Sequence, residues 1–523
     1  MLSFLRGWSW KQAAPRMIAD AVTVQIAAIG SLLGVVLWQL NDPRASGAPD
    51  LEAVLQHYYI YRFLPLSWLF PFTFLLHGFY THSRAYSTSY KWKALARGAT
   101  MATLIFLLAS FLVSRAGELP RSAVLLFVVL VNAGVIGTRM FKQLLLNTAV
   151  PEPARAEGVA AEVAPAADSP ILVVGGAGYI GSMLCHKMIA SGRRVRVLDS
   201  LVYGDSAIRD LIGHPRFELN VGDCRNIQSV VSAVSGASAI VHLAAIVGDP
   251  ACEQDRKSSL EINYAATRML IEIAKGERVK RFLFASSCSV YGATDLLMDE
   301  KSQVAPISLY AQTKVDSERA LIAAQDGRFH PTILRLATVF GNSYRSRFDL
   351  VVNLLTAKAL QEGVITIFNG DQWRPFIHVG DAAEGFLTAL DAPLGAVSGE
   401  TFNLGDSRLN FSLSQVAEKI LEIVPGVRVV HTENSDRRNY RVSFDKVRNQ
   451  LGYTCRRQLE DGILELKKAF EEGTIRDYTE PQYNNQRFLR AAGLLIPKEE
   501  MDAHVMAAFS SALQNQQQNV LVS

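Results

Sequence analysis

Long apolar runs occupy the first 140 residues of the chain and are rare in the remainder. Four such stretches lie at residues 18–40, 59–80, 99–114 and 122–137. A helix needs about 20 mostly apolar residues to cross a bilayer, so the pattern predicts an all-α region of four transmembrane helices within residues 1–146. The last two stretches are near the short end of that range, and buried helices of a soluble protein are the alternative.

Basic residues in this region are unevenly placed between the apolar stretches. They gather before the first stretch, between the second and third, and after the fourth, at Arg6, Lys11, Arg16, Arg84, Lys91, Lys93, Arg97, Arg139 and Lys142. Lys and Arg favour the cytoplasmic side of a membrane, so both ends of the region are expected in the cytoplasm. The sequence therefore predicts a multi-pass protein of the inner (plasma) membrane whose following domain is cytoplasmic.

The pattern changes after residue 146. Residues 147–169 are rich in Ala, Pro and Glu without periodicity, as in a linker. From residue 170 to 480, short β-rich runs alternate with amphipathic helical runs, which predicts an α/β domain built on a doubly wound parallel sheet, with a smaller C-terminal substrate-binding part. The tail, residues 481–523, includes a Gln-rich segment and is expected to be mobile.

Composition and charge exclude several classes of function. The net charge is only +4, too small to indicate a nucleic-acid-binding protein. The five cysteines are scattered without disulfide or metal-ligand spacing, and His242 has no second ligand at a suitable distance in the sequence, so no metal site is expected.

The first strand of the domain leads into a glycine-rich turn. Gly175, Gly178 and Gly181 follow an apolar run, and a helix is expected to begin near Tyr179. Glycines allow close approach of a phosphate to the free N–H groups of such a helix, so the turn predicts a dinucleotide site. Asp199 ends the second strand, where a carboxylate binds the adenosine ribose and repels a 2′-phosphate. NAD is therefore favoured over NADP.

Further motifs follow in a fixed order along the chain. With the glycine turn and Asp199, they resemble the extended short-chain dehydrogenase/reductase family, and within it the nucleotide-sugar epimerases and dehydratases. The resemblance covers roughly residues 170 to 480 and rests on Gly222-Asp223-Cys224-Arg225, His242-Leu-Ala-Ala245, Ser286-Ser287-Cys288-Ser289-Val-Tyr291-Gly292, Tyr310-x-x-x-Lys314 and Arg374-Pro-Phe-Ile-His378.

The resemblance implies three catalytic residues. Tyr310 would remove the proton of a sugar hydroxyl as hydride leaves, although free tyrosine has a pKa near 10. Lys314 lies four residues later on one helix face, where its charge is expected to favour the phenolate. Ser287 would align the same substrate oxygen.

The same resemblance implies the binding residues. Ser289, Asn353 and Arg374 are the expected substrate contacts, with Arg345 and Arg347 as additional cations that suit a diphosphate. Asp223 has a second interpretation as a turn residue. The expected NAD contacts are Gly175, Gly178, Tyr179, Ile180, Gly181, Asp199, Asp223, Cys224, Ala244, Tyr310 and Lys314.

One departure from the family bears on the reaction. The 4,6-dehydratases carry acidic residues directly after the catalytic Ser or Thr, whereas Cys288, Ser289 and Val290 follow Ser287 here. An NAD-dependent nucleotide-sugar epimerase is therefore favoured, acting through a transient keto sugar with inversion at C4. Dehydratase or keto-sugar reductase activity, or a non-catalytic NAD-sensing membrane scaffold, are the alternatives. A nucleotide-diphosphate sugar, the lipid bilayer and a second copy in a homodimer are the expected partners, in polysaccharide biosynthesis.

Overall fold

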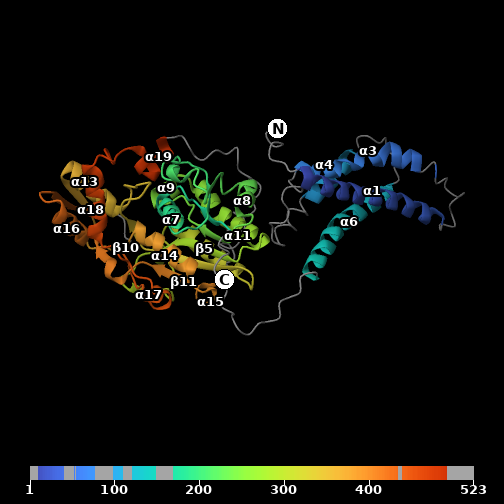
Figure 1. Ribbon diagram of the computed structural model, residues 1–523. Coiled ribbons are helices and arrows are strands. Elements are labelled where there is room, and N and C mark those ends of the chain that lie inside the picture. The colour runs from blue at the N-terminus through green and yellow to red at the C-terminus, as the bar shows by residue number, and fades with distance from the viewer. Residues whose placement is uncertain are drawn as a thin grey trace. The chain divides into compact units, whose positions relative to one another are not determined.

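The computed structural model describes residues 10–40, 52, 55–76, 98–109, 121–148, 169–433 and 439–491. The chain divides into two compact units, Met1–Gly158 and Val159–Ser523 (Figure 1). Most of the predicted linker, residues 149–168, and the tail from residue 492 lie outside the described residues.

The first unit is helical. Its helices are α1 (Trp10–Leu40), the π-helix η2 (Leu55–Phe63), α3 (Leu64–Ser67), α4 (Leu69–Leu76), an unlabelled helix (Gly98–Ala109) and α6 (Arg121–Thr148). α1 packs along α6. Phenylalanine rings fill the space between the helices, and the rings of Phe106 and Phe127 lie 4.6 Å apart. The apolar stretches thus have one buried side that holds the unit together.

One helix among the described residues is long and apolar enough to cross a membrane, Met17–Trp38 within α1. The apolar parts of the third and fourth predicted spans, Gly98–Ala109 and Ser122–Val135, are shorter, and the second is divided among η2, α3 and α4. Length decides this point, because a bilayer core is about 30 Å thick. The prediction of a four-helix, multi-pass membrane region is therefore wrong, and a single candidate span replaces it.

The second unit is built on a seven-stranded sheet in the order β11-β7-β5-β4-β1-β2-β3. All neighbouring strands are parallel. The predicted doubly wound parallel sheet is confirmed. The strands are β1 (Ile171–Val174), β2 (Val195–Asp199), β3 (Phe217–Val221), β4 (Ala239–His242), β5 (Arg281–Ser287), β7 (His330–Leu336) and β11 (Thr401–Leu404).

Two groups of helices pack against this sheet. α7 (Tyr179–Ala190) and α14 (Val379–Asp391) contact each other, as do α8 (Ile227–Val234) and α12 (Leu309–Ala324) with α11 (Ala266–Gly276). The central strands β1 and β4 are fully buried, in keeping with their apolar sequences. The strand order reverses between β1 and β4, where a crevice opens at the carboxyl ends of the strands.

Smaller sheets and helices complete the second unit. β10 (Trp373–His378) lies between β8 (Thr338–Phe340) and β12 (Asn410–Ser412). The strands β9 (Val364–Phe368) and β13 (Arg428–Thr432) form one pair, and β6 (Leu297–Met298) and β14 (Arg441–Val442) another. The remaining helices that bear on the site are α9 (Asp249–Gln254), α10 (Arg256–Leu260), the 3₁₀ turn η5 (Cys288–Tyr291), α13 (Val351–Glu362), α16 (Leu413–Ile423), α18 (Leu459–Glu471) and α19 (Asn485–Ala491).

Candidate active site

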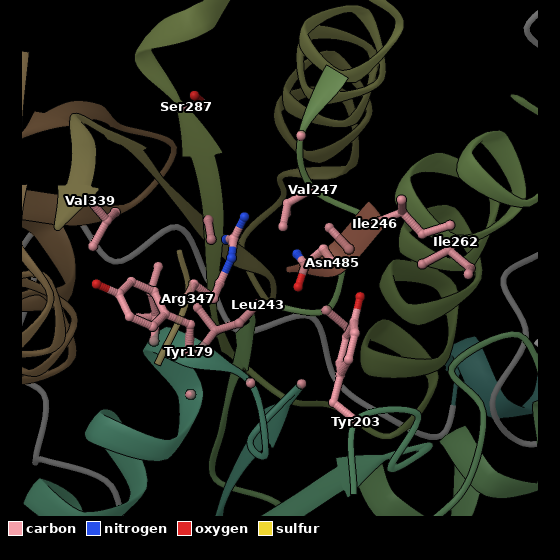
Figure 2. A pocket seen from close by; sticks show the side chains of 18 of the residues that line it. Tyr179, Tyr203, Leu243, Ile246, Val247, Ile262, Ser287, Val339, Arg347 and Asn485 are labelled. Carbon is pink, nitrogen blue, oxygen red and sulfur yellow. The ribbon is translucent and has the colours of Figure 1, made fainter. Parts of the chain in front are cut away.

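A pocket of about 380 Å³ lies at the carboxyl ends of the central strands. Its wall includes every predicted site residue except Asn353 and Arg374. Figure 2 shows side chains from distant parts of the chain meeting around it, among them Tyr179, Tyr203, Ser287, Arg347 and Asn485. The volume is within the range of about 300–1,000 Å³ that is usual for small-molecule sites.

The glycine turn is shaped for close approach of a ligand. Gly175 has a φ of 89°, and a Cβ there would lie 2.7 Å from the backbone nitrogen of Ala244. A Cβ on Gly181 would collide with the carbonyl oxygen of Gly175. Gly178 caps α7 without a side-chain hydrogen bond to the first turn, so no capping side chain occupies the N–H groups of that turn. This cradle fits the pyrophosphate of a dinucleotide.

Asp199 lies at the end of β2 and faces the pocket. Its carboxylate accepts hydrogen bonds from the backbone N–H groups of Ala177, at 2.9 Å, and Leu201, at 2.8 Å. Burial raises the pKa of Asp199, while these two bonds and the charge of Arg345 oppose the rise. These hydrogen bonds fix the position of the Asp199 carboxylate relative to the glycine turn. The nearby cations Arg193, Arg194 and Arg196 form ion pairs with Asp391 and Glu218.

Asp223 lines the pocket but its carboxylate is paired. Arg225 Nη2 lies 2.7 Å from Asp223 Oδ2, and the same guanidinium lies 3.2 Å from Glu261. The backbone N–H of Arg225 also donates to Asp223, so the aspartate has the turn role that was its second interpretation. The neighbouring thiol of Cys224 has a pKa raised by burial, which keeps it protonated.

The three predicted catalytic residues meet at one end of the pocket. Ser287 ends β5, while Tyr310 and Lys314 lie one turn apart on α12. Lys314 Nζ donates a hydrogen bond to the carbonyl oxygen of Ala285 at 2.7 Å and lies 5.6 Å from the ring centre of Tyr310. Burial lowers the pKa of Lys314 to about 8.

The pKa of Tyr310 differs from the expectation. Burial raises it well above 10, and the thiol of Cys252 and the carboxylate of Asp249 add to the rise. Arg347 and the side chain of Ser287 lower it. The protein groups alone therefore do not favour the phenolate, and the ammonium group of Lys314 donates to the carbonyl oxygen of Ala285. The expected role of Lys314 beside Tyr310 stays a prediction.

A buried polar network holds α12 against the sheet. Ser286 donates to Glu318, which forms a salt bridge of 2.7 Å with Arg335 on β7. Arg335 also donates to the hydroxyl of Tyr291 at 3.0 Å. Glu318 lies four residues after Lys314, on the same side of the helix, so the network fixes the face that carries Tyr310.

Ser289 lines the pocket beside Ser287. Its Oγ is buried and has no hydrogen-bond partner within the described part of the chain, as expected of a group that contacts a ligand. The preceding Cys288 is buried instead, and its thiol donates to the carbonyl oxygen of Arg335.

Asn353 and Arg374 do not line this pocket, and their role as substrate contacts stays a prediction. The Asn353 side chain is fully buried and donates to the carbonyl oxygens of Gly341 and Arg347, at 3.0 and 2.8 Å. It thus shapes the loop after β8. Arg374 donates to the Trp373 carbonyl and to the Gln372 side chain, behind Tyr440.

Several pocket residues were not anticipated from the sequence. Asp249 begins α9, after the positive φ of 95° at Gly248. Tyr203 follows Asp199 in a loop, and Asn485 comes from α19 in the expected tail. Of these three residues, Asp249 had a signal in the sequence, because it lies four residues after the motif that ends at Ala245. Among the described residues no group of three or more His, Cys, Asp or Glu side chains is arranged to hold a metal ion.

The family comparison agrees with this geometry. Residues 171–405 match the model of the NAD dependent epimerase/dehydratase family. This part of the chain belongs to that family. The protein is thus an enzyme of the NAD-dependent epimerase/dehydratase family, and its cofactor is NAD.

Similar proteins in this family catalyse more than one reaction. An uncharacterised UDP-glucose epimerase of Bacillus subtilis (strain 168) is 28% identical over 314 residues, covering 56% of this chain and 95% of the relative. A dTDP-glucose 4,6-dehydratase of Streptomyces niveus is 28% identical over 317 residues, covering 58% and 93%. The structure of UDP-glucuronic acid 4-epimerase from Bacillus cereus, in complex with UDP-glucuronic acid and NAD, is 25% identical, with a TM-score of 0.52 and coverage of 57% and 99%.

Proposed function

We propose that this enzyme inverts the configuration at C4 of a nucleotide-diphosphate sugar through a transient keto intermediate. The observation that carries the proposal is the meeting of Ser287, Tyr310 and Lys314 in the pocket that contains the glycine turn and Asp199. Similarity to epimerases that act on UDP-sugars supports the substrate class. A protein that only sensed NAD would not need a proton-transfer group at this position.

The residues divide the proton chemistry among them. When bound, NAD would accept a hydride from the sugar and return it. Tyr310 takes the proton from the sugar hydroxyl. It returns the proton after the keto sugar has rotated and presents its opposite face for the return of hydride. Ser287 holds the same oxygen, and the unpartnered Ser289 Oγ is available to a neighbouring sugar hydroxyl. Lys314 places a positive charge 5.6 Å from the Tyr310 ring, and together with the charge of oxidised NAD it would offset part of the burial that disfavours the phenolate.

Dehydration is the second candidate, and one observation favours it. Asp249 places a carboxylate in the pocket, and its charge raises the pKa of Tyr310, so the two groups are close enough to interact. The dehydratases carry acidic residues after the catalytic Ser or Thr, and this chain has none directly after Ser287. Asp249 on α9 thus supplies an acidic group from another part of the chain. Elimination of water needs such a group to protonate the departing hydroxyl.

Product analysis separates the two reactions. The purified protein is incubated with UDP-, GDP- and dTDP-sugars, and the products are followed by NMR and mass spectrometry. Epimerisation gives a product of unchanged mass with a new coupling pattern at C4. Loss of one water identifies a dehydratase, and an absence of turnover on all the sugars contradicts both.

We further propose that α1 tethers the enzyme to the inner membrane, with the catalytic unit in the cytoplasm. Ile18, Val22 and Ile26 on α1 are exposed, an arrangement that suits contact with lipid. NAD and nucleotide sugars are cytoplasmic metabolites, which sets the side of the membrane. The homodimer stays a prediction.

A further inference from the structure

A buried donor without a partner lies in the pocket wall. The Nε atom of Arg345 is buried and has no hydrogen-bond partner among the residues that the structure describes. The guanidinium group lies 3.7 Å from the ring centre of Tyr203, and Nη2 donates to Asn485 Oδ1 at 2.7 Å. Two contacts thus fix the plane of the group, while the buried Nε–H has no acceptor among the described residues. Such a donor is costly unless a ligand supplies the acceptor.

The position of Arg345 is at the Asp199 end of the pocket. Both residues line it, and the charge of Arg345 lowers the pKa of Asp199. Burial in turn lowers the pKa of Arg345 itself to about 10. The arginine whose charge lowers the pKa of Tyr310 is Arg347. Arg345 therefore belongs to the end of the pocket where the adenosine ribose is expected, not to the reacting end.

Helix α19 holds this arginine in place. Asn485 is 2% exposed, and its backbone N–H donates to Asp349 at 3.3 Å. Three residues later, the ring of Phe488 lies 5.1 Å from that of Tyr203. Figure 2 shows Tyr203 and Asn485 both reaching into the pocket. The helix lies well beyond residue 405, where the family match ends.

We propose that Arg345, clamped between Tyr203 and Asn485, is a cofactor-binding residue whose Nε donates a hydrogen bond to the adenosine ribose-phosphate half of NAD. Ribose and phosphate oxygens are acceptors, and a guanidinium is the donor group best suited to them. Helix α19 is then part of the cofactor site. This inference concerns the NAD site and holds whichever sugar is the substrate.

Two fragments of NAD locate the contact. ADP-ribose contains the adenosine half and nicotinamide mononucleotide the other half, and the binding of each to nucleotide-free, full-length protein in detergent is measured by calorimetry. Arg345→Met, which keeps an unbranched chain but removes the donors, should weaken ADP-ribose binding roughly 10- to 100-fold, the range for losing a hydrogen bond to a charged group. Binding of the mononucleotide should stay within about twofold, because it does not reach this end.

Variants on α19 provide a second test and its control. Phe488 does not line the pocket, so Phe488→Ala removes only its packing on Tyr203. This variant should weaken ADP-ribose binding by roughly 3- to 10-fold and leave the mononucleotide unaffected. Gln486 is exposed on the same helix, and Gln486→Ala should bind both fragments as the unaltered protein does.

Two results would overturn the proposal. One is unchanged ADP-ribose affinity in Arg345→Met with an unaltered unfolding temperature. The other is an equal loss of affinity for both fragments, which would indicate general damage to the pocket. If Arg345→Met does not fold, the affinities of Phe488→Ala for ADP-ribose and for the mononucleotide are compared in the same way. None of these measurements depends on sugar turnover, so failure here is distinct from failure of the proposed reaction.

Discussion

The ammonium group of Lys314 donates a 2.7 Å hydrogen bond to the carbonyl oxygen of Ala285, two residues before Ser287. This bond ties the catalytic helix α12 to the strand β5 that carries the serine. It also fixes a positive charge in a site where Lys314 is 3% exposed. Because burial disfavours the charged form of Lys314, the stability of the folded protein is expected to depend on pH.

The stability of the catalytic unit should depend on the protonation of Lys314. Burial lowers its pKa from 10.5 to about 8, so between these values the unfolded chain carries a proton that the folded protein has released. Stability therefore rises with pH across this window, by up to about 3 kcal/mol. In Lys314→Met this rise should be absent. Lys275→Met, at a partly exposed ion pair with Asp326, is the matched control.

Calorimetric unfolding of the NAD-free protein between pH 7.5 and 10.5 measures the effect. The quantity compared is the change in unfolding temperature with pH, because other groups contribute equally to all three proteins. Equal slopes for Lys314→Met and the unaltered protein would contradict the shifted pKa.

Removing the Tyr310 hydroxyl tests the proposed proton transfer. Tyr310→Phe keeps the ring in its apolar surroundings but deletes the acid–base group, so turnover should fall by about 10²–10⁴. NAD affinity and unfolding temperature should change little. Tyr264→Phe, at a buried tyrosine outside the pocket, is the control and should retain turnover. Nearly full turnover in Tyr310→Phe would require a different base.

Asp249→Asn distinguishes the two candidate reactions. The substitution keeps the shape of the side chain and removes its charge. If the enzyme is an epimerase, turnover should fall less than about tenfold, because Tyr310 performs the proton transfer alone. A loss of about 10² or more, with the keto sugar accumulating, would show that Asp249 takes part in elimination. Stopped-flow absorbance at the NADH band together with mass spectrometry of the products measures both.

A charge on the outer side of α1 tests the tether. Ile26 is 66% exposed near the middle of the candidate span. Ile26→Arg should reduce insertion at a cost of about 2.5–3.5 kcal/mol, and move protein from the membrane to the soluble fraction. Leu296→Arg, at an exposed position of the catalytic unit, should leave the distribution unchanged. Membrane fractionation with immunoblotting measures the outcome, and an unchanged Ile26→Arg distribution would contradict a tether through α1.

The sequence predicted those parts of the site that depend on local backbone rules. Gly175 and Gly181 were identifiable because a fixed spacing between strand and helix demands residues without a side chain. Asp199 was identifiable because it ends the next strand. Both predictions rest on short-range geometry, which the spacing of residues determines.

Other parts of the site depend on which way a side chain points. Arg374 has the residue type expected for a diphosphate contact, but β10 turns it toward Trp373 and Gln372. Asn353 lies on the buried side of α13. Asn485 reaches the pocket from residues 481–523, which were predicted to be a mobile tail, so no local signal marked it. In the first unit, likewise, the apolar stretches of the sequence are longer than the apolar helices of the structure, because composition does not mark where a helix ends.

Ser286 and Ser287 point to opposite sides of β5, as successive residues of a strand must. Ser286 anchors α12 through Glu318, while Ser287 faces the reactants. Deletion or insertion of one residue in this strand would turn each serine to the opposite side of the sheet, so neither serine could keep its role. Evolution can therefore change the length of the loops around this pocket more freely than that of β5, and new sugar preferences are expected to arise through loops such as 341–349, with the strand left as it is.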